Sequence, residues 1–217
     1  MVMNTAAIID RAELAGGLER LGLEPSDRVL DGFERYASLL LKWNKVYNLT
    51  AIRRPEEVLT HHLLDSAALA PALRRFAPEA DAVLDVGCGG GLPSVPLALL
   101  RPDVAVTGVD AVGKKAAFVN QAAIELGLRN LQARHARIEK LGGAWGVITS
   151  RAFASLADFT RLTTHLLAPG GCWLAMKGVI PEDEIAALPA GIRVSAIETL
   201  DVPGLAEERH LIVLVRD

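Results

Sequence analysis

The chain has 217 residues, of which 51% are hydrophobic and 23% are charged. This balance is typical of a globular protein and excludes a disordered or fibrous chain. The 23 basic and 26 acidic side chains give a formal net charge of −3, which argues against a protein whose whole surface binds nucleic acid.

The sequence shows no targeting, membrane or metal signal. Residues 1–10 lack the basic start and apolar run of a signal peptide, and no apolar stretch approaches the ~18 to 20 residues that cross a bilayer. Cys88 and Cys172 lack the CxxC spacing of a metal site and form no disulfide framework. We therefore expect a cytoplasmic protein with no metal and no membrane partner, and we expect it to be a monomer.

The first part of the chain is predicted to be helical. Ser26 can cap a long amphipathic segment whose apolar residues recur at spacings of three and four and which ends near Asn48. Pro55 can open a second helix with the same periodicity, which Pro71 and Pro78 are expected to break. Residues 1–80 are thus predicted to form a helical N-terminal extension.

From residue 81 onward, short β-rich runs alternate with helical stretches. The expected strands are Ala82 to Val86, Val104 to Val109, Leu131 to Arg134, Val147 to Ser150 and Cys172 to Met176, and the expected helices are Ser94 to Leu100, Lys114 to Leu126 and Leu156 to Leu167. This alternation predicts a parallel sheet covered by helices. The last two runs, Ile192 to Ile197 and Leu211 to Val215, have no room for a long helix between them and predict an antiparallel pair at the sheet edge.

One segment of this acidic protein is basic. Residues 36–55 carry Lys42, Lys45, Arg53 and Arg54 and no carboxylate. Together with Lys114, Lys115 and Lys177, these side chains are candidates for contacts with the phosphates of a polyanion, with salt-dependent binding as the consequence. The alternative for each of them is an ordinary solvated charge.

The most informative segment is a glycine loop directly after the first predicted strand. There the chain passes through Gly87, Gly89 and Gly91 before the next helix begins, so the backbone can turn sharply and approach a ligand at the helix N-terminus. The second predicted strand is followed by Asp110, whose carboxylate can accept hydrogen bonds from both hydroxyls of a ribose. The pattern predicts a nucleotide site at the carboxyl ends of the strands.

Two details indicate which cofactor this loop suits. A dinucleotide-binding fingerprint requires glycine at the sixth position, which Leu92 occupies here, and Asp85 stands two residues before Gly87. The resulting Asp-x-Gly-x-Gly-x-Gly form resembles the first motif of class I S-adenosylmethionine methyltransferases. A dinucleotide site and a plain strand-to-helix turn are the less favoured alternatives.

Further motifs extend this resemblance to one family. They are Trp43-Asn44-Lys45, Asn48-Leu49-Thr50-Ala51-Ile52, His61 to Ser66, Gly87 to Ala98, Val109-Asp110 with Lys114-Lys115, Ser150 to Leu156, and Ala175-Met176-Lys177-Gly178. In this order they resemble the ribosomal RNA small-subunit methyltransferase G family, also called glucose-inhibited division protein B. One departure is Ser94, which stands where the family commonly has glycine.

The resemblance implies both a fold and an activity. The implied fold is α/β, with a doubly wound, mostly parallel seven-stranded sheet behind a helical N-terminal extension, so that residues 81–217 form the S-adenosylmethionine-binding methyltransferase domain. The implied reaction transfers a methyl group from S-adenosylmethionine to N7 of a guanosine in small-subunit (16S) ribosomal RNA, with naked RNA or a ribosomal particle as the partner. Guanine N7 already carries a free lone pair, so no catalytic base is required, and orientation can supply ~7 to 11 kcal/mol.

The resemblance also implies site residues. Gly87, Gly89, Gly91 and Leu92 would form the loop beneath the cofactor, Asp110 would bind its ribose, and Ala111, Val112, Ile138 and Glu139 would border its adenine. Arg151 is the best candidate for positioning; it would pair with the methionine carboxylate or steer the RNA, or else form only a surface salt bridge.

Several residues keep two interpretations. Asp85 can tie its turn or contact the cofactor, and Asn48 can cap a helix or lie near the target base. His61, His62 and Asp65 invite a catalytic or metal role, but a helix-surface pair or an interdomain contact is favoured. Two other functions stay open: a small-molecule methyltransferase that depends on S-adenosylmethionine, and a non-catalytic ribosome-assembly factor that binds it.

Overall fold

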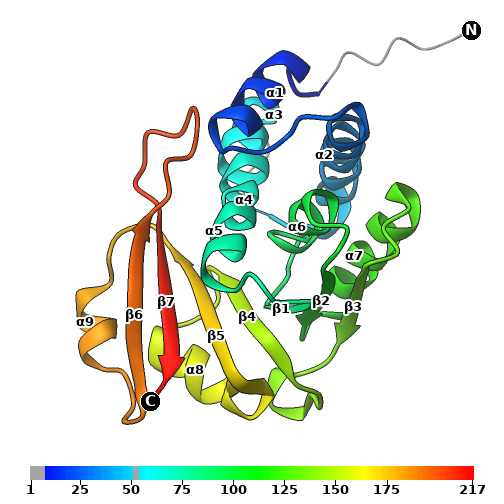
Figure 1. Cartoon of the computed structure of the whole chain (residues 1–217). Coiled ribbons are helices and arrows are strands. Elements are labelled where there is room, and N and C mark those ends of the chain that lie inside the picture. Colours follow the sequence, from blue (N-terminus) through cyan, green and yellow to red (C-terminus); the bar gives the residue numbers. More distant parts are fainter. Residues whose placement is uncertain (1–7, 51–53) are drawn as a thin grey trace, which may run out of the picture.

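The computed structural model describes residues 8–50 and 54–217, and its centre is one seven-stranded sheet (Figure 1). The strand order is β3-β2-β1-β4-β5-β7-β6. Neighbours from β3 to β5 are parallel, whereas β7 is antiparallel to both β5 and β6. The strands are β1 Ala82–Val86, β2 Ala105–Asp110, β3 Leu131–His135, β4 Trp145–Arg151, β5 Leu167–Lys177, β6 Ile192–Thr199 and β7 His210–Arg216.

Helices cover both faces of the sheet, as the alternation of buried side chains on each strand requires. On β1, Val83 packs with the N-terminal helices, α6 and α7, while Leu84 packs on the opposite face with α8. On β5, Leu174 packs on the same face as Val83, and Trp173 packs on the same face as Leu84. The expected doubly wound, mostly parallel seven-stranded α/β fold is confirmed.

The helices fall into two groups along the chain. The α and π segments before β1 are α1 Arg11–Arg20, α2 Asp27–Tyr47, α3 Pro55–Val58, the π-helix η1 Leu59–Leu64, α4 Asp65–Ala67 and α5 Leu69–Phe76. Those that follow are α6 Ser94–Leu100, α7 Gly113–Leu126, η2 Ile138–Lys140, α8 Leu156–Thr163, η3 Thr164–Leu166 and α9 Glu182–Ala186. The first group shares one apolar core with α6 and α7, so the extension is packed onto the sheet domain.

Some predicted boundaries were wrong. The helix expected to reach Leu167 ends at Leu166, because Leu167 already pairs with Trp145 in the sheet. Pro71 does not break the helix: it is the third residue of α5, where a backbone N–H would have no partner within the helix. The short helices α1 and α9 were not predicted.

The carboxyl ends of the parallel strands face the helices of the extension. The connection from β6 to β7, residues 200–209, rises from the sheet and lies beside α3 and α4 (Figure 1). Two contacts join it to the extension: Arg209 Nε lies 3.1 Å from Asp65 Oδ1, and His61 Nε2 lies 3.4 Å from Glu207 Oε1. Three separate parts of the chain therefore meet at this edge.

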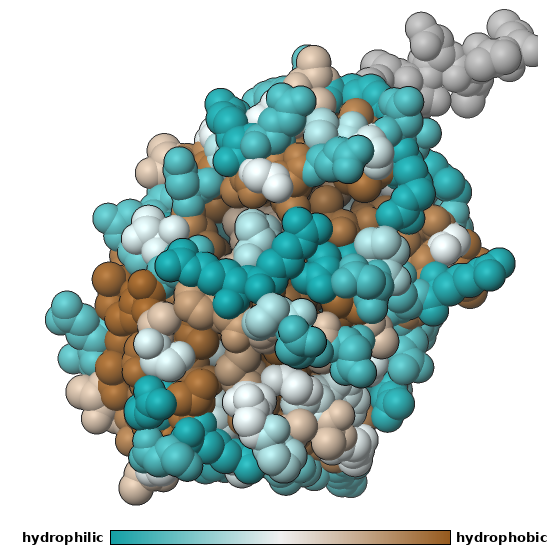
Figure 2. All heavy atoms as spheres, viewed as in Figure 1, coloured by the Kyte–Doolittle hydropathy of each residue, from teal (hydrophilic) through white to brown (hydrophobic). Residues whose placement is uncertain are grey.

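On the face shown in Figure 2, hydrophilic side chains form a band across the middle of the molecule, and apolar side chains gather over β6 and β7. Within the described part of the chain, none of the helices is long and apolar enough to cross a membrane.

Candidate active site

The glycine loop after β1 has the backbone conformation that its sequence predicts. Gly87, Gly89 and Gly91 all have φ between 53° and 83°, a left-handed region that costs most other residues about 1–2 kcal/mol. A Cβ atom on Gly91 would lie 2.7 Å from Val95 Cγ2, and one on Gly87 would lie 2.8 Å from the Phe153 ring. The loop thus needs glycine both for its conformation and for its close packing.

A tyrosine from the N-terminal extension fixes this loop. Tyr36, on α2, is completely buried, and its hydroxyl donates a hydrogen bond of 2.5 Å to the carbonyl oxygen of Gly90. Burial raises the pKa of Tyr36 well above its usual value, so the hydroxyl stays protonated and remains a donor. The extension is therefore part of the loop's support.

Asp85 is held mainly by its own turn. Ser94 Oγ donates to Asp85 Oδ2 at 2.5 Å, while Oδ1 is buried without a hydrogen-bond partner among the described residues. Burial raises the pKa of Asp85 to about 6. Ser94 begins α6 and is not among the residues with positive φ, so replacing the family's glycine by serine does not strain this backbone.

Asp110, at the end of β2, connects the two loops around it. Its Oδ2 accepts from the backbone N–H of Gly89 at 3.0 Å, and its Oδ1 accepts from that of Val112 at 2.8 Å. Each carboxylate oxygen can accept a further hydrogen bond. The side chain is thus fixed in place and keeps the capacity to bind hydroxyl groups.

A first cavity of about 350 Å³ lies at these strand ends. Five residues predicted to bind a cofactor line it: Gly87, Asp110, Ala111, Ile138 and Glu139. Gly89, Gly91 and Leu92 belong to the glycine loop but do not line the cavity, and neither does Val112, which is 40% exposed. An oriented carboxylate, a glycine-lined wall and apolar side chains fit a nucleoside.

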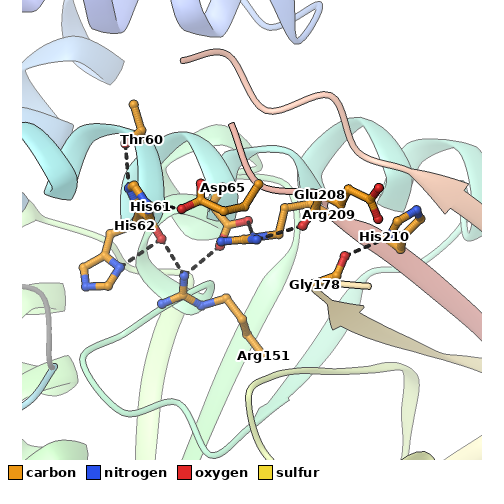
Figure 3. Close-up of polar contacts among 10 residues, drawn as sticks. Thr60, His61, His62, Asp65, Arg151, Gly178, Glu208, Arg209 and His210 are labelled. Atoms are coloured by element: carbon orange, nitrogen blue, oxygen red, sulfur yellow. Dashed lines mark hydrogen bonds and ion pairs between the residues drawn. The ribbon is translucent and has the colours of Figure 1, made fainter. Parts of the chain in front are cut away.

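Arg151 is directed elsewhere, toward the N-terminal extension (Figure 3). Its Nη1 donates to Asp65 Oδ2 at 2.8 Å and to the carbonyl oxygen of His61 at 2.9 Å. Asp65, whose side chain is only 3% exposed, also accepts from Arg209 through its other oxygen. One buried carboxylate therefore bridges two guanidinium groups, one from β4 and one from the residue just before β7.

His62 closes the same region and is neutral. Its Nδ1 lies 3.0 Å from the carbonyl oxygen of His61 and its Nε2 lies 2.6 Å from Thr50 Oγ1. A carbonyl only accepts, so Nδ1 carries the proton and Nε2 accepts from the threonine. Burial, with Arg151 nearby, lowers the pKa of His62 to about 4. Both bonds of His62 thus stay within the N-terminal extension, whereas Asp65 makes the favoured interdomain contact, through Arg151 and Arg209.

Arg151 lines a second cavity, of about 490 Å³. Its wall also includes His62, Asp65, Lys177 and Arg209. Ala152 lines both cavities, and it is one of two described non-glycine residues with positive φ, at 53°. The turn at Ala152 places Arg151 on the second cavity and Phe153 on the first, so the two cavities meet there.

The predicted RNA-contacting residues do not form a single group. Lys42, Lys45, Asn48 and Lys114 are exposed; Arg54 is exposed and pairs with Glu57; and Arg53 lies outside the described residues. Asn48 ends α2 with φ of 50°, a conformation that asparagine tolerates. Lys115 lines the first cavity. Lys177 is held by Glu184 at 2.8 Å and by the carbonyl oxygen of Ala154 at 3.0 Å.

Neither cysteine is arranged for catalysis. Both Cys88 and Cys172 are buried, and burial raises the pKa of the first well above its usual value and that of the second to about 11. Both therefore remain thiols, which are poor nucleophiles. The described ranges, 8–50 and 54–217, contain no group of three or more His, Cys, Asp or Glu side chains that could hold a metal ion.

Sequence reasoning missed two features of this edge. Arg209 was not predicted because it stands in a C-terminal segment assigned by periodicity alone, with no local motif around it. Tyr36 is one of the apolar residues that recur at helical spacing, and that position does not reveal the hydrogen bond made by its hydroxyl. Both contacts join residues far apart in the chain.

Comparison with known proteins gives a consistent result. Residues 30–212 match a family model described as rRNA small subunit methyltransferase G. The ribosomal RNA small subunit methyltransferase G of Ralstonia nicotianae is 56% identical over 217 aligned residues, covering 97% of each chain. That of Neisseria gonorrhoeae is 48% identical and covers 94% of this chain and 97% of its own.

Solved structures share the fold at low identity. Magnesium protoporphyrin IX methyltransferase from Synechocystis, solved with bound S-adenosylmethionine, is 17% identical with a TM-score of 0.59, covering 88% of this chain and 98% of its own. TrmN from Thermus thermophilus is 22% identical with a TM-score of 0.56, covering 73% and 53%. At these identities the likeness concerns the fold alone.

Proposed function

The chain belongs to the rRNA small subunit methyltransferase G family, and from this premise we propose that it methylates N7 of a guanosine in small-subunit ribosomal RNA, with S-adenosylmethionine as the methyl donor. The observation that carries the proposal is the meeting of two cavities at Ala152. One suits a nucleoside cofactor, and the other is lined by cationic side chains.

The first cavity supports binding of S-adenosylmethionine, whose sulfonium supplies the methyl group. Asp110 would accept from the ribose hydroxyls, Ala111 and Ile138 would border the adenine, and Gly87 would lie against the ligand through its backbone. Asp85 Oδ1, which is buried without a hydrogen-bond partner among the described residues, would accept from the ammonium group of the cofactor's methionine part, directly or through a water.

Methylation of guanine N7 requires the protein to orient the reactants and does not require a catalytic base. Guanine N7 carries no proton at neutral pH, so methylation removes none, and the acceptor lone pair must only point at the methyl carbon opposite sulfur. Holding reactants in this geometry can lower a barrier by ~7 to 11 kcal/mol. The neutral His62 and the thiols of Cys88 and Cys172 agree with this view, because none of them is poised to remove a proton.

The exposed cations on and beside α2 are proposed to meet the RNA backbone. Lys42 and Lys45 lie on this helix, and Lys114 lies at the start of α7 with its Nζ 6.0 Å from the ring centre of Tyr47. Phosphate contacts of this kind position an RNA without reading its sequence. We propose that the protein acts as a monomer in the cytoplasm, where the ribosomal substrate is found.

The test is methyl transfer from labelled S-adenosylmethionine into small ribosomal subunits, and separately into their naked RNA, taken from cells that lack the gene. We expect label in 7-methylguanosine after nucleoside analysis, and the ratio of the two substrates will show which is recognised. Binding of the cofactor without incorporation into either substrate would instead support a small-molecule acceptor or a binding role.

A further inference from the structure

We propose that the second cavity receives the acceptor guanine, turned out of its RNA stack, and that Arg209 reads its O6 atom while Asp65 acts as a positioning residue for Arg209 and Arg151. The inference deepens the proposed function and rests on it. Enzymes that modify a base inside a helix turn it out into a pocket and read it there by hydrogen bonds. The major-groove edge of guanine, which carries N7, lies in the deep, narrow groove of A-form RNA.

The position of the second cavity suits an acceptor. It adjoins the first cavity at Ala152. A base bound in the second cavity would therefore face the methyl group of a donor bound in the first. Its volume of about 490 Å³ falls within the range of small-molecule sites. Its wall is completed by the N-terminal extension through Thr50, His61 and His62.

The polar groups at this cavity favour guanine over adenine. Among residues 8–50 and 54–217, Arg151 bonds through Nη1 and Arg209 through Nε and Nη1, so other guanidinium nitrogens remain as donors at the wall. A guanidinium has no acceptor. It can bond to O6 of guanine, beside N7, but it faces another donor in the amino group of adenine. A donor on O6 leaves the N7 lone pair available to the methyl group.

Asp65 makes this arrangement rigid. Its two oxygens each accept from a different arginine, at 2.8 Å and 3.1 Å (Figure 3), and its side chain is 3% exposed. Arg151 comes from β4 and Arg209 directly precedes β7, so without the carboxylate two like charges would face one cavity unpaired. Asp65 touches neither cofactor nor base in this account and acts through the arginines.

The test compares Arg209→Met, which removes the donors and keeps the side-chain length, with Arg193→Met on the neighbouring strand β6. Arg193 is 59% exposed and pairs with Asp217 at 3.4 Å. We expect Arg209→Met to lower kcat for 7-methylguanosine formation at least 30-fold, with a Kd for S-adenosylmethionine within twofold of wild type. Arg193→Met is expected to match wild type in both. An equal kcat for Arg209→Met and wild type would overturn the proposal while the proposed function stands.

A binding measurement gives a readout independent of turnover. In saturation-transfer NMR with the cofactor product S-adenosylhomocysteine bound, we expect guanosine and inosine monophosphates, which share O6, to give stronger signals than adenosine monophosphate. Arg209→Met should abolish this preference. Equal signals for all three nucleotides on wild type would contradict it, and wild-type protein that forms no 7-methylguanosine would overturn the proposed function and this inference together.

Asp65→Asn separates positioning from folding. The amide keeps the shape of the side chain but removes the charge shared by the arginines, so we expect kcat to fall at least tenfold with an unchanged Kd for S-adenosylmethionine. A cooperative melting transition shows that the variant is folded. If Asp65→Asn does not fold, the Arg209→Met result decides; a folded Asp65→Asn with wild-type kcat would remove Asp65 from the account.

Discussion

The two cavities that meet at Ala152 are built in different ways. The first is formed by backbone loops directly after β1, β2, β3 and β4, with Asp110 bonded to the N–H groups of Gly89 and Val112. The second is assembled by residues from the extension, β4, the end of β5 and the connection before β7, and it is held by the ion pairs of Asp65. Local backbone geometry thus shapes the first cavity, and long-range ion pairs shape the second.

The largest loss of affinity for S-adenosylmethionine is expected at Gly91, where the backbone conformation requires glycine. Gly91→Ala places a Cβ atom 2.7 Å from Val95 Cγ2 at a φ of +83°, at a combined cost of about 2–5 kcal/mol from conformation and overpacking. We expect the Kd for S-adenosylmethionine, measured by calorimetry, to rise at least about 30-fold. Gly142→Ala, with nothing within 4 Å of the added atom, is the control; equal affinity in both variants would contradict the account.

The contributions of Asp85 and His62 to the free energy of unfolding should change with pH in opposite directions. The pKa of Asp85 is raised to about 6 by burial, so its contribution to the free energy of unfolding is present below about pH 4 and is lost as pH rises through 6. The pKa of His62 is lowered to about 4, by burial first and then by Arg151. Its contribution is present above about pH 6.5 and is lost as pH falls through 4. Each shift corresponds to about 3 kcal/mol.

Two variants separate these opposing contributions to the free energy of unfolding. Between about pH 4 and 6.5, the stability of Asp85→Asn relative to wild type should rise with pH, and that of His62→Gln should fall. Urea unfolding at several pH values gives both differences. Differences that stay constant across this range would show that these groups are not the source of the effect.

Tyr36→Phe tests the link between the extension and the first cavity. The variant leaves the carbonyl of Gly90 without its buried donor, at a cost of about 1–3 kcal/mol. We expect weaker binding of S-adenosylmethionine, by about tenfold, with an unchanged KM for RNA. Tyr47→Phe, at a residue that is 37% exposed, should match wild type. A change in the KM for RNA alone would show that Tyr36 supports the second cavity and not the first.

The smallest effect is expected from single surface cations. Lys45 is exposed on α2, whereas Lys177 is held by Glu184 at 2.8 Å. Lys45→Ala should reduce the slope of log K for RNA against log salt by about 0.7–0.9, and Lys177→Ala should leave it nearly unchanged. Titrations at four salt concentrations measure the slopes, and the reverse order would show that RNA displaces Glu184.

The same contrast explains what the sequence could predict. The glycine loop and Asp110 were found because the strand, the turn and the helix that form the first cavity are consecutive in the chain. Arg151 was placed at the site from its motif, but its partner Asp65 lies 86 residues away, and Arg209 lies 144 residues from the same carboxylate. Periodicity carries no information on such pairs. Periodicity predicted the positions of the strands along the chain, and it failed at Pro71 and Leu167, where position within the element decides.

We propose that cofactor and acceptor bind in separate cavities that meet at Ala152. A crystal structure with S-adenosylhomocysteine would show which cavity holds the cofactor. We expect the ribose at Asp110, the adenine between Ala111 and Ile138, and the sulfur directed past Ala152 toward Arg151 and Arg209. An adenine bound in the second cavity, or a sulfur directed away from Ala152, would show that the two cavities do not have these roles.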